Sequence, residues 1–135
     1  NPRRIAVGLD QNRLSMLLAV LHRHGNVQMN DQDVFVNVVG GGRVTETSAD
    51  LALLLAMISS FRNRSLPNDL IVFGEVGLAG EIRPVQRVEQ RILEAEKLGF
   101  STIFVSKLNK LSIKNPQINI RRVSKIEDVV AFLFE

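Results

Sequence analysis

Apolar side chains recur at the spacing of an α-helix in four segments of the chain, and a helix is predicted for each. The segments cover residues 10–24, 46–62, 85–98 and 126–133. In the first, leucines follow the i, i+3, i+4, i+7 pattern that places side chains on one helix face. The segment 46–62 is apolar almost all round, which predicts a helix at the centre of the domain.

Runs rich in Val, Ile and Phe lie between these helices and predict β-strands at residues 33–39, 70–77, 101–106 and 118–123. Glycines and a proline after the second run indicate a turn and a short return strand. Strands that alternate with helices are typical of the α/β (α+β) class, here expected as one mixed sheet packed with helices. A length of 135 residues fits a single domain over 1–135.

Composition narrows the classes of function. The chain has no Cys, which excludes disulfides, thiolate catalysis and Cys-ligated zinc within it and suits a cytoplasmic protein. No apolar run reaches the length of a membrane span and no signal-peptide pattern is present, so no membrane partner is expected. The net charge of +3 is compatible with a polyanionic partner without requiring one.

Two patterns have a simple structural explanation. Gly40, Gly41 and Gly42 follow a predicted strand and precede a helix, an order that can bind phosphate through backbone N–H groups. Because the G-x-G-x-x-G and Walker A spacings are both missing, a tight turn is the favoured interpretation. His22 and His24 point to different sides of one helix, so they predict neither a metal site nor a Ser-His-Asp triad.

Ser48 lies where polar residues give way to the apolar run of the central helix, in the string "TETSADLALLLA". Hydroxyl and acidic residues at such a position cap a helix and favour its dipole, and the residues alone favour this role. A nucleophilic serine would need a base, which in a Ser-Lys pair is a lysine amine.

This string, the following "GEVGLAGEIRPV" and the charged helix after it resemble the proteolytic domain of Lon-type proteases. In that family a serine in a P-S-A-G motif opens a helix, and a later helix carries the catalytic lysine. The resemblance implies a Lon-protease-like fold and aligns Ser48 and Ala49 with the serine motif. The strand and the turn that follow also match the family, at Gly74, Glu75, Gly80, Ile82 and Pro84. Aligned without a gap, the lysine position falls on Arg91.

The chain departs from the Lon pattern at the residues that carry the catalytic chemistry. Glu46, Thr47 and Asp50 replace the Gly, Pro and Gly around the serine, and Arg91 replaces the lysine. Arginine stays charged at any pH at which proteins are studied and has no lone pair to accept a proton. The dyad positions Ser48 and Arg91 are therefore predicted to be degenerate, and the chain is not expected to be an enzyme.

If the dyad is degenerate, Ser48 and Arg91 should have structural roles. Ser48 is expected to remain as a helix cap, and Arg91 to pair with a carboxylate such as Glu94 or Glu75. The alternative is an active Lon-type serine peptidase that uses Ser48 with an unorthodox base.

The strings "QDVFVNVVGG", "VTETSADLALLLA" and "FGEVGLAGEIRPV" closely resemble the C-terminal Lon-like domain of the bacterial RadA (Sms) family of DNA-repair proteins. The resemblance runs from about Val7 onward. It implies a platform for hexamer formation and a DNA-binding module in an ATP-driven repair and recombination motor that promotes branch migration. A recombinase of the RecA type is a possible partner. ATP, Mg and Zn are expected only in parts of such a protein outside this chain, which has no Walker A sequence and needs no cofactor here.

Cations that could face DNA are densest in the strings "KLNKLSIK" and "IRRVSK". The candidates for DNA binding are Arg87, Lys107, Lys110, Lys114, Arg121, Arg122 and Lys125. No aromatic residues interleave with them, so base stacking is not expected, and binding would be to the phosphate backbone with weak sequence dependence. Scaffolding without any contact to DNA is the alternative for this surface.

Overall fold

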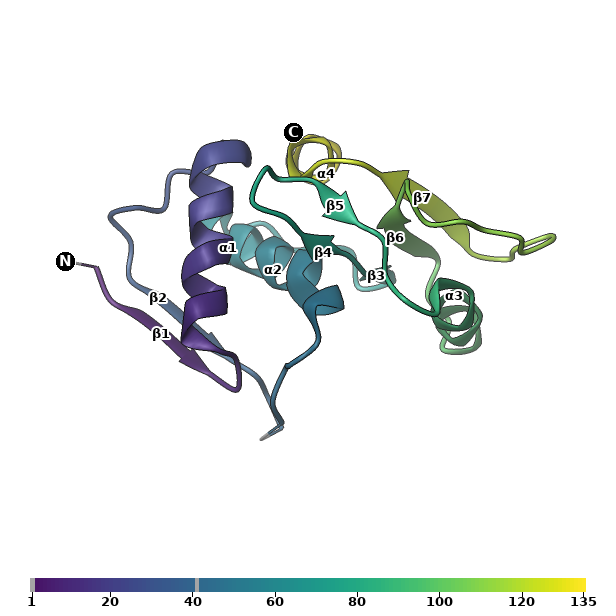
Figure 1. Ribbon diagram of the computed structural model, residues 1–135, viewed down its shortest axis with the longest axis horizontal. Coiled ribbons are helices and arrows are strands. Elements are labelled where there is room, and N and C mark those ends of the chain that lie inside the picture. The colour runs from purple at the N-terminus through teal and green to yellow at the C-terminus, as the bar shows by residue number, and fades with distance from the viewer. Residues whose placement is uncertain (1, 41) are drawn as a thin grey trace.

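The computed structural model describes residues 2–40 and 42–135, and the elements within these ranges alternate between helices and strands (Figure 1). The helices are α1 (Gln11–His24), α2 (Asp50–Arg62), α3 (Val88–Lys97) and α4 (Ile126–Phe134), and a 3-10 turn, η1 (Thr47–Ala49), leads into α2. The strands are β1 (Arg4–Val7), β2 (Val34–Asn37), β3 (Leu70–Val72), β4 (Glu75–Val76), β5 (Ile82–Arg83), β6 (Thr102–Ser106) and β7 (Asn119–Val123). The predicted α/β class is confirmed.

The strands form small separate sheets where one mixed sheet was expected. In the described part of the chain, β1 and β2 pair in parallel, β3, β6 and β7 form a parallel sheet in that order, and β4 pairs antiparallel with β5. The strand predicted over 70–77 is therefore split. Its interruption lies at Gly74, whose N–H donates to the Ser48 carbonyl (2.9 Å) and whose carbonyl accepts from the Leu51 N–H (3.0 Å). Because these groups bond to the start of α2, they are not available to a continuous strand ladder.

The turn predicted after this strand is confirmed. Gly80 adopts a left-handed conformation with φ +78°, which favours glycine, and the chain then returns as β5. The strand β1 was not predicted, because the sequence "RIAV" is too short to show a clear alternation.

Helix α2 lies in the main hydrophobic core, as its apolar sequence predicted, with Leu51, Leu54 and Ile58 fully buried. The central strand β6 contributes to two cores on opposite faces of its sheet. Phe104 packs into the main core with α2 and α4, whereas Ile103 packs into a second cluster with α3. The sheet β3-β6-β7 thus lies between α3 on one side and α2 with α4 on the other (Figure 1).

A buried ion pair joins α1 to the start of α2. Asp50, the first residue of α2, is 1% exposed, and its carboxylate accepts hydrogen bonds from Arg13 Nε (2.9 Å) and Nη2. The same carboxylate accepts the N–H of Val76 in β4 (3.0 Å). The hydrogen bond to Asp50 raises the pKa of Arg13, so the arginine stays charged at any pH at which the domain is studied. One carboxylate therefore fixes the relative positions of α1, α2 and β4.

We expect Asp50→Ala to lower the free energy of unfolding by about 3–5 kcal/mol, because it leaves the Arg13 charge and the Val76 N–H without their acceptor. Chemical denaturation measures this, with the exposed Asp69→Ala as the matched control. The double variant Arg13→Met/Asp50→Leu should regain much of the loss, since it removes both charges. An Asp50→Ala protein as stable as the Asp69→Ala control would contradict this role.

Candidate functional site

Ser48 lies in η1, one turn before α2, and is 8% exposed. Its Oγ donates a hydrogen bond to Glu46 Oε1 at 2.7 Å. The expectation that Ser48 caps the helix is wrong, since the hydroxyl makes no capping hydrogen bond to α2. The backbone performs that role instead, because the Leu51 N–H donates to the Gly74 carbonyl and the Ala49 N–H to the Glu46 carbonyl.

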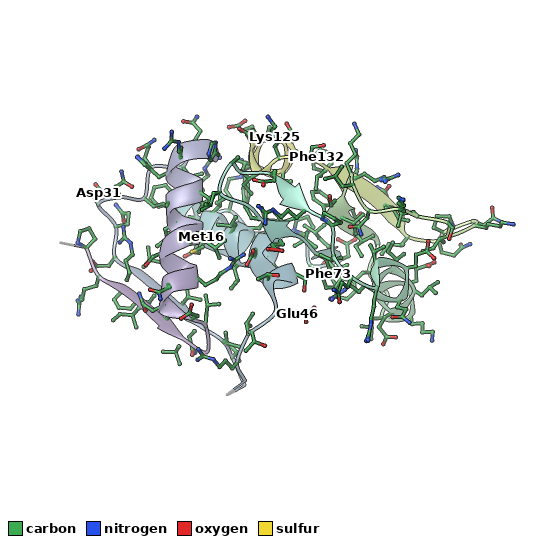
Figure 2. All side chains as sticks on the ribbon, in the orientation of Figure 1. Met16, Asp31, Glu46, Phe73, Lys125 and Phe132 are labelled. Carbon is green, nitrogen blue, oxygen red and sulfur yellow. The ribbon has the colours of Figure 1, made fainter. Side chains whose placement is uncertain are left out.

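Arg91 reaches the same carboxylate from α3. Its Nη2 forms a salt bridge with Glu46 Oε1, its Nε donates to the Gln86 carbonyl (2.9 Å), and its guanidinium lies over the Phe73 ring at 4.9 Å. Figure 2 labels Glu46 and Phe73, two of the residues that this guanidinium contacts. Together these contacts leave the side chain 22% exposed.

The expectation that Arg91 pairs with a carboxylate is confirmed, but the partner is Glu46, and the named examples Glu94 and Glu75 are wrong. Glu75 Oε1 lies 3.8 Å from Arg83 Nη1 instead, and no salt bridge of Glu94 occurs within the described residues. The Gln86 carbonyl and the Phe73 ring direct the guanidinium toward the segment before Ser48, which brings it to Glu46.

Glu46 thus links the two positions that the Lon resemblance assigns to the dyad. The Ser48 hydrogen bond and then the Arg91 guanidinium lower the pKa of the Glu46 carboxyl below its ordinary value. A carboxylate with a lowered pKa is a weak base, and a guanidinium cannot accept a proton. The hydroxyl of Ser48 is therefore hydrogen-bonded to a group that is poorly suited to activate it.

A pocket of about 400 Å³ opens beside this link. Its lining combines the linked side chains with further residues from the segment before α2, from β4 and from the segment between β5 and α3. These further residues are Thr45, Thr47, Glu75, Pro84, Val85 and Gln86.

The basic candidates lie on the loop between β6 and β7, on β7 itself and at the starts of α3 and α4. The loop 107–117 is fastened to the domain at several points. Asn109 is buried and bonds both backbone groups of Val85, through Oδ1 (3.2 Å) and Nδ2 (2.9 Å). This holds the loop residues Lys107 and Lys110 close to the segment that carries Arg87.

Further contacts fasten the loop along its length. Arg122 Nη2 donates to the Lys107 carbonyl (2.8 Å) and to the Asn109 carbonyl. Glu89 accepts the Ser112 N–H and hydroxyl, which lowers the pKa of Glu89. Arg122 therefore has a structural role, which its place in a basic string did not distinguish from that of its neighbours.

The remaining candidates are exposed and differ in their surroundings. Arg121 lies over the ring of Phe132 in α4, at 4.3 Å, and Figure 2 labels Phe132 and Lys125 beside α4. Lys114 lies toward the other end of β7, since β6 and β7 run in parallel and the loop returns to Asn119 beside Thr102.

The sequence alone missed the partners that shape this site. Glu46 was recognised as a departure from the Lon pattern, but its contact with Arg91 was not foreseen. The sequence did contain a sign of this contact. Relative to the Lon pattern, position 46 gains a negative charge and position 91 keeps a positive one, so the two residues could form a pair. The buried Asn109 and the ion pair of Asp50 had no comparable signal, since both resemble ordinary surface residues in the sequence.

The other sequence patterns add no site among the described residues. Gly41, the middle residue of the glycine loop, lies outside the described residues, and Gly40 has φ +93°. Within 2–40 and 42–135, no group of His, Asp or Glu residues is arranged to hold a metal ion. No helix among these residues is both long enough and apolar enough to cross a membrane.

The Glu46 carboxyl should titrate below the ordinary glutamate value, which carbon-detected NMR measures. We expect Ser48→Ala and Arg91→Gln each to raise this pKa, because each removes a group that favours the anion. A carboxyl whose pKa is lowered on folding stabilises the folded state at every pH above the pKa that it has in the unfolded chain. This stabilisation is lost as the pH falls through the pKa of the folded state. An unchanged Glu46 pKa in both variants would contradict the link.

Comparison with known proteins identifies the relatives of this chain. The family model described as subunit ChlI of Mg-chelatase matches residues 6–109. The DNA repair protein RadA of Haemophilus influenzae is 64% identical over 98% of this chain, and that of Escherichia coli is 63% identical over 97%. The chain spans only 29% and 28% of the lengths of these two relatives. The predicted resemblance to the RadA DNA-repair proteins is confirmed, and the chain belongs to the family that the ChlI model describes.

Proposed function

We propose that this chain is a non-catalytic module of an ATP-dependent DNA repair and recombination motor, where it binds the DNA backbone and forms the platform of a hexamer. The observation that carries the non-catalytic part is the Glu46 link. The position that would need a neutral amine holds Arg91, whose charge is fixed against a carboxylate. The names of the relatives support the association with DNA repair.

The DNA-binding part of the proposal rests on exposed lysines, most of them on the loop between β6 and β7, which hydrogen bonds hold to the domain. Lys107, Lys110, Lys114 and Lys125 are exposed and form no salt bridge within the described residues. Ammonium groups of this kind can neutralise phosphates and release counterions, whereas Arg122 already uses its guanidinium on the loop. The lysines are therefore the better candidates for contact with DNA.

The platform role is supported by where apolar side chains are exposed. Ile5, Val7 and Phe35 are exposed on β1 and β2, while Leu93 and Leu98 are exposed on and just after α3. Figure 1 shows these elements at opposite ends of the long axis. A ring needs contacts between two different faces of each subunit, and two apolar ends meet that requirement.

The rest of the proposed motor lies outside this chain. The relatives are more than three times its length, since the chain spans 29% or less of each of the two. We assign ATP hydrolysis, Mg and Zn to such additional parts, a cytoplasmic location to the whole, and a RecA-type recombinase as a possible partner.

Labelled DNA titrated at several salt concentrations tests the DNA-binding part. We expect Lys107→Ala/Lys110→Ala/Lys114→Ala to weaken binding and to reduce the slope of log affinity against log salt by about two to three, at roughly 0.7–0.9 for each phosphate that is no longer neutralised. The control Lys97→Ala removes an exposed lysine on α3 and should leave both quantities unchanged. A salt-independent response of the unaltered chain would favour scaffolding without DNA contact.

A fluorogenic-peptide assay tests the non-catalytic part against the alternative, a Lon-type peptidase that uses Ser48. We expect no turnover above background, and none in Arg91→Lys, because Glu46, Thr47 and Asp50 also depart from the serine motif. Peptide hydrolysis by the unaltered chain that disappears in Ser48→Ala would overturn the proposal.

A further inference from the structure

We propose that Arg91 and Ser48 form a binding site for a small phosphate-type oxyanion, and that the Glu46 carboxylate occupies this site in the present structure. The inference goes beyond the DNA-binding surface and does not depend on it. Two donors from different elements, a guanidinium on α3 and a hydroxyl on η1, converge on the single oxygen Glu46 Oε1. That convergence of an arginine and a hydroxyl on one anionic oxygen is the arrangement that recognises carboxylate and phosphate.

The donors are held in place by groups other than Glu46. The Gln86 carbonyl and the Phe73 ring orient the Arg91 guanidinium. Ser48 is nearly buried, and its carbonyl accepts the Gly74 N–H at 2.9 Å, which fixes the turn that carries the hydroxyl. Both donors should therefore keep their positions when the carboxylate leaves.

The carboxylate, in contrast, is held only by those two donors. Glu46 is 64% exposed, and its side chain makes no other hydrogen bond within the described residues. Asp50 provides a comparison in the same protein, because its carboxylate is buried and receives three hydrogen bonds from α1 and β4. Asp50 is a permanent partner of its arginine, whereas Glu46 can be exchanged for another anion.

The surroundings favour phosphate as the ligand. The adjoining pocket of about 400 Å³ has room for it, and Thr45 and Thr47 line the pocket. Phosphate offers separate oxygens to the guanidinium and to the hydroxyl, which must share one oxygen of Glu46. Glu75 also lines the pocket, and Arg83, which lies 3.8 Å from its carboxylate and 3.1 Å from that of Glu81, offsets part of its charge. Once Glu46 leaves, Arg91 is the cation that lines the pocket.

A tethered carboxylate competes strongly with a free ligand, because its effective concentration is on the order of millimolar or more. The unaltered chain should therefore bind added phosphate weakly, and removal of the Glu46 carboxylate should reveal the site. The matched control is Glu94→Ala, which removes an equal charge one turn from Arg91 without removing a contact of Arg91.

The test is a titration with inorganic phosphate at constant ionic strength, followed by NMR at the Arg91 Nε–H and the Ser48 amide. We expect Glu46→Ala to bind phosphate at least about tenfold more tightly than the unaltered chain, and Glu94→Ala to resemble the unaltered chain. Glu46→Ala/Arg91→Gln should lose the gain. A parallel titration with acetate compares the two oxyanions, and we expect Glu46→Ala to gain more affinity for phosphate than for acetate. A gain for acetate without a gain for phosphate would contradict the proposal.

Two results would overturn the proposal. One is equal phosphate affinity in Glu46→Ala and the unaltered chain, and the other is a gain that persists when Arg91 is also replaced. The amide spectrum away from the site verifies folding, and Glu46→Gln, which keeps the side-chain length, provides a second variant expected to show a smaller gain. Because no DNA is present, failure of the proposed DNA binding would leave this result unaffected.

Discussion

The position of the candidate site depends on the carboxylate of Asp50. Burying an ion pair carries a desolvation cost, which good geometry and additional hydrogen bonds must offset. Asp50 meets this condition through two contacts from Arg13 and one from the Val76 N–H. As the first residue of α2, it also lies where the helix dipole favours a negative charge. The start of α2 is thereby fixed to α1 and β4, and the turn that carries Ser48 is fixed with it.

Two arginine–carboxylate pairs in this domain differ in the burial of the carboxylate, and this difference decides whether the carboxylate can leave its arginine. In the Arg13–Asp50 pair the carboxylate is buried, and loss of the arginine would leave its charge inside the protein without a cation. The Arg91–Glu46 pair combines a well-held guanidinium with an exposed carboxylate, and water solvates that carboxylate when the pair separates, so separation costs little free energy. The Arg91 guanidinium cannot accept a proton, and Glu46 supplies the partner that its permanent charge requires.

Periodicity in the sequence predicted what local patterns determine, and missed what distant contacts determine. The four helices follow from the spacing of their apolar residues, and the turn at Gly80 from its glycine. The division into separate sheets could not be foreseen, because it depends on Gly74 bonding to the start of α2. The capping role of Ser48 was wrong for a related reason, since the carbonyls of Gly74 and Glu46 accept the N–H groups of Leu51 and Ala49. The partner of Arg91 lies 45 residues away, beyond the reach of a pattern along one helix.

The loop between β6 and β7 shows how composition can mislead about order. Its lysines, asparagines and serine resemble a linker, yet Asn109, Arg122, Glu89 and Glu96 fasten it to the domain. The planar guanidinium of Arg122 reaches two carbonyls at once, a task for which a lysine ammonium is less suited. The lysines are left to face solvent. A polyanion that meets charges on such a support orders fewer residues on binding, so less of the electrostatic attraction is offset by lost entropy. Because Arg122 holds the loop and the lysines remain exposed, a basic loop of ordinary composition presents its charges in fixed positions.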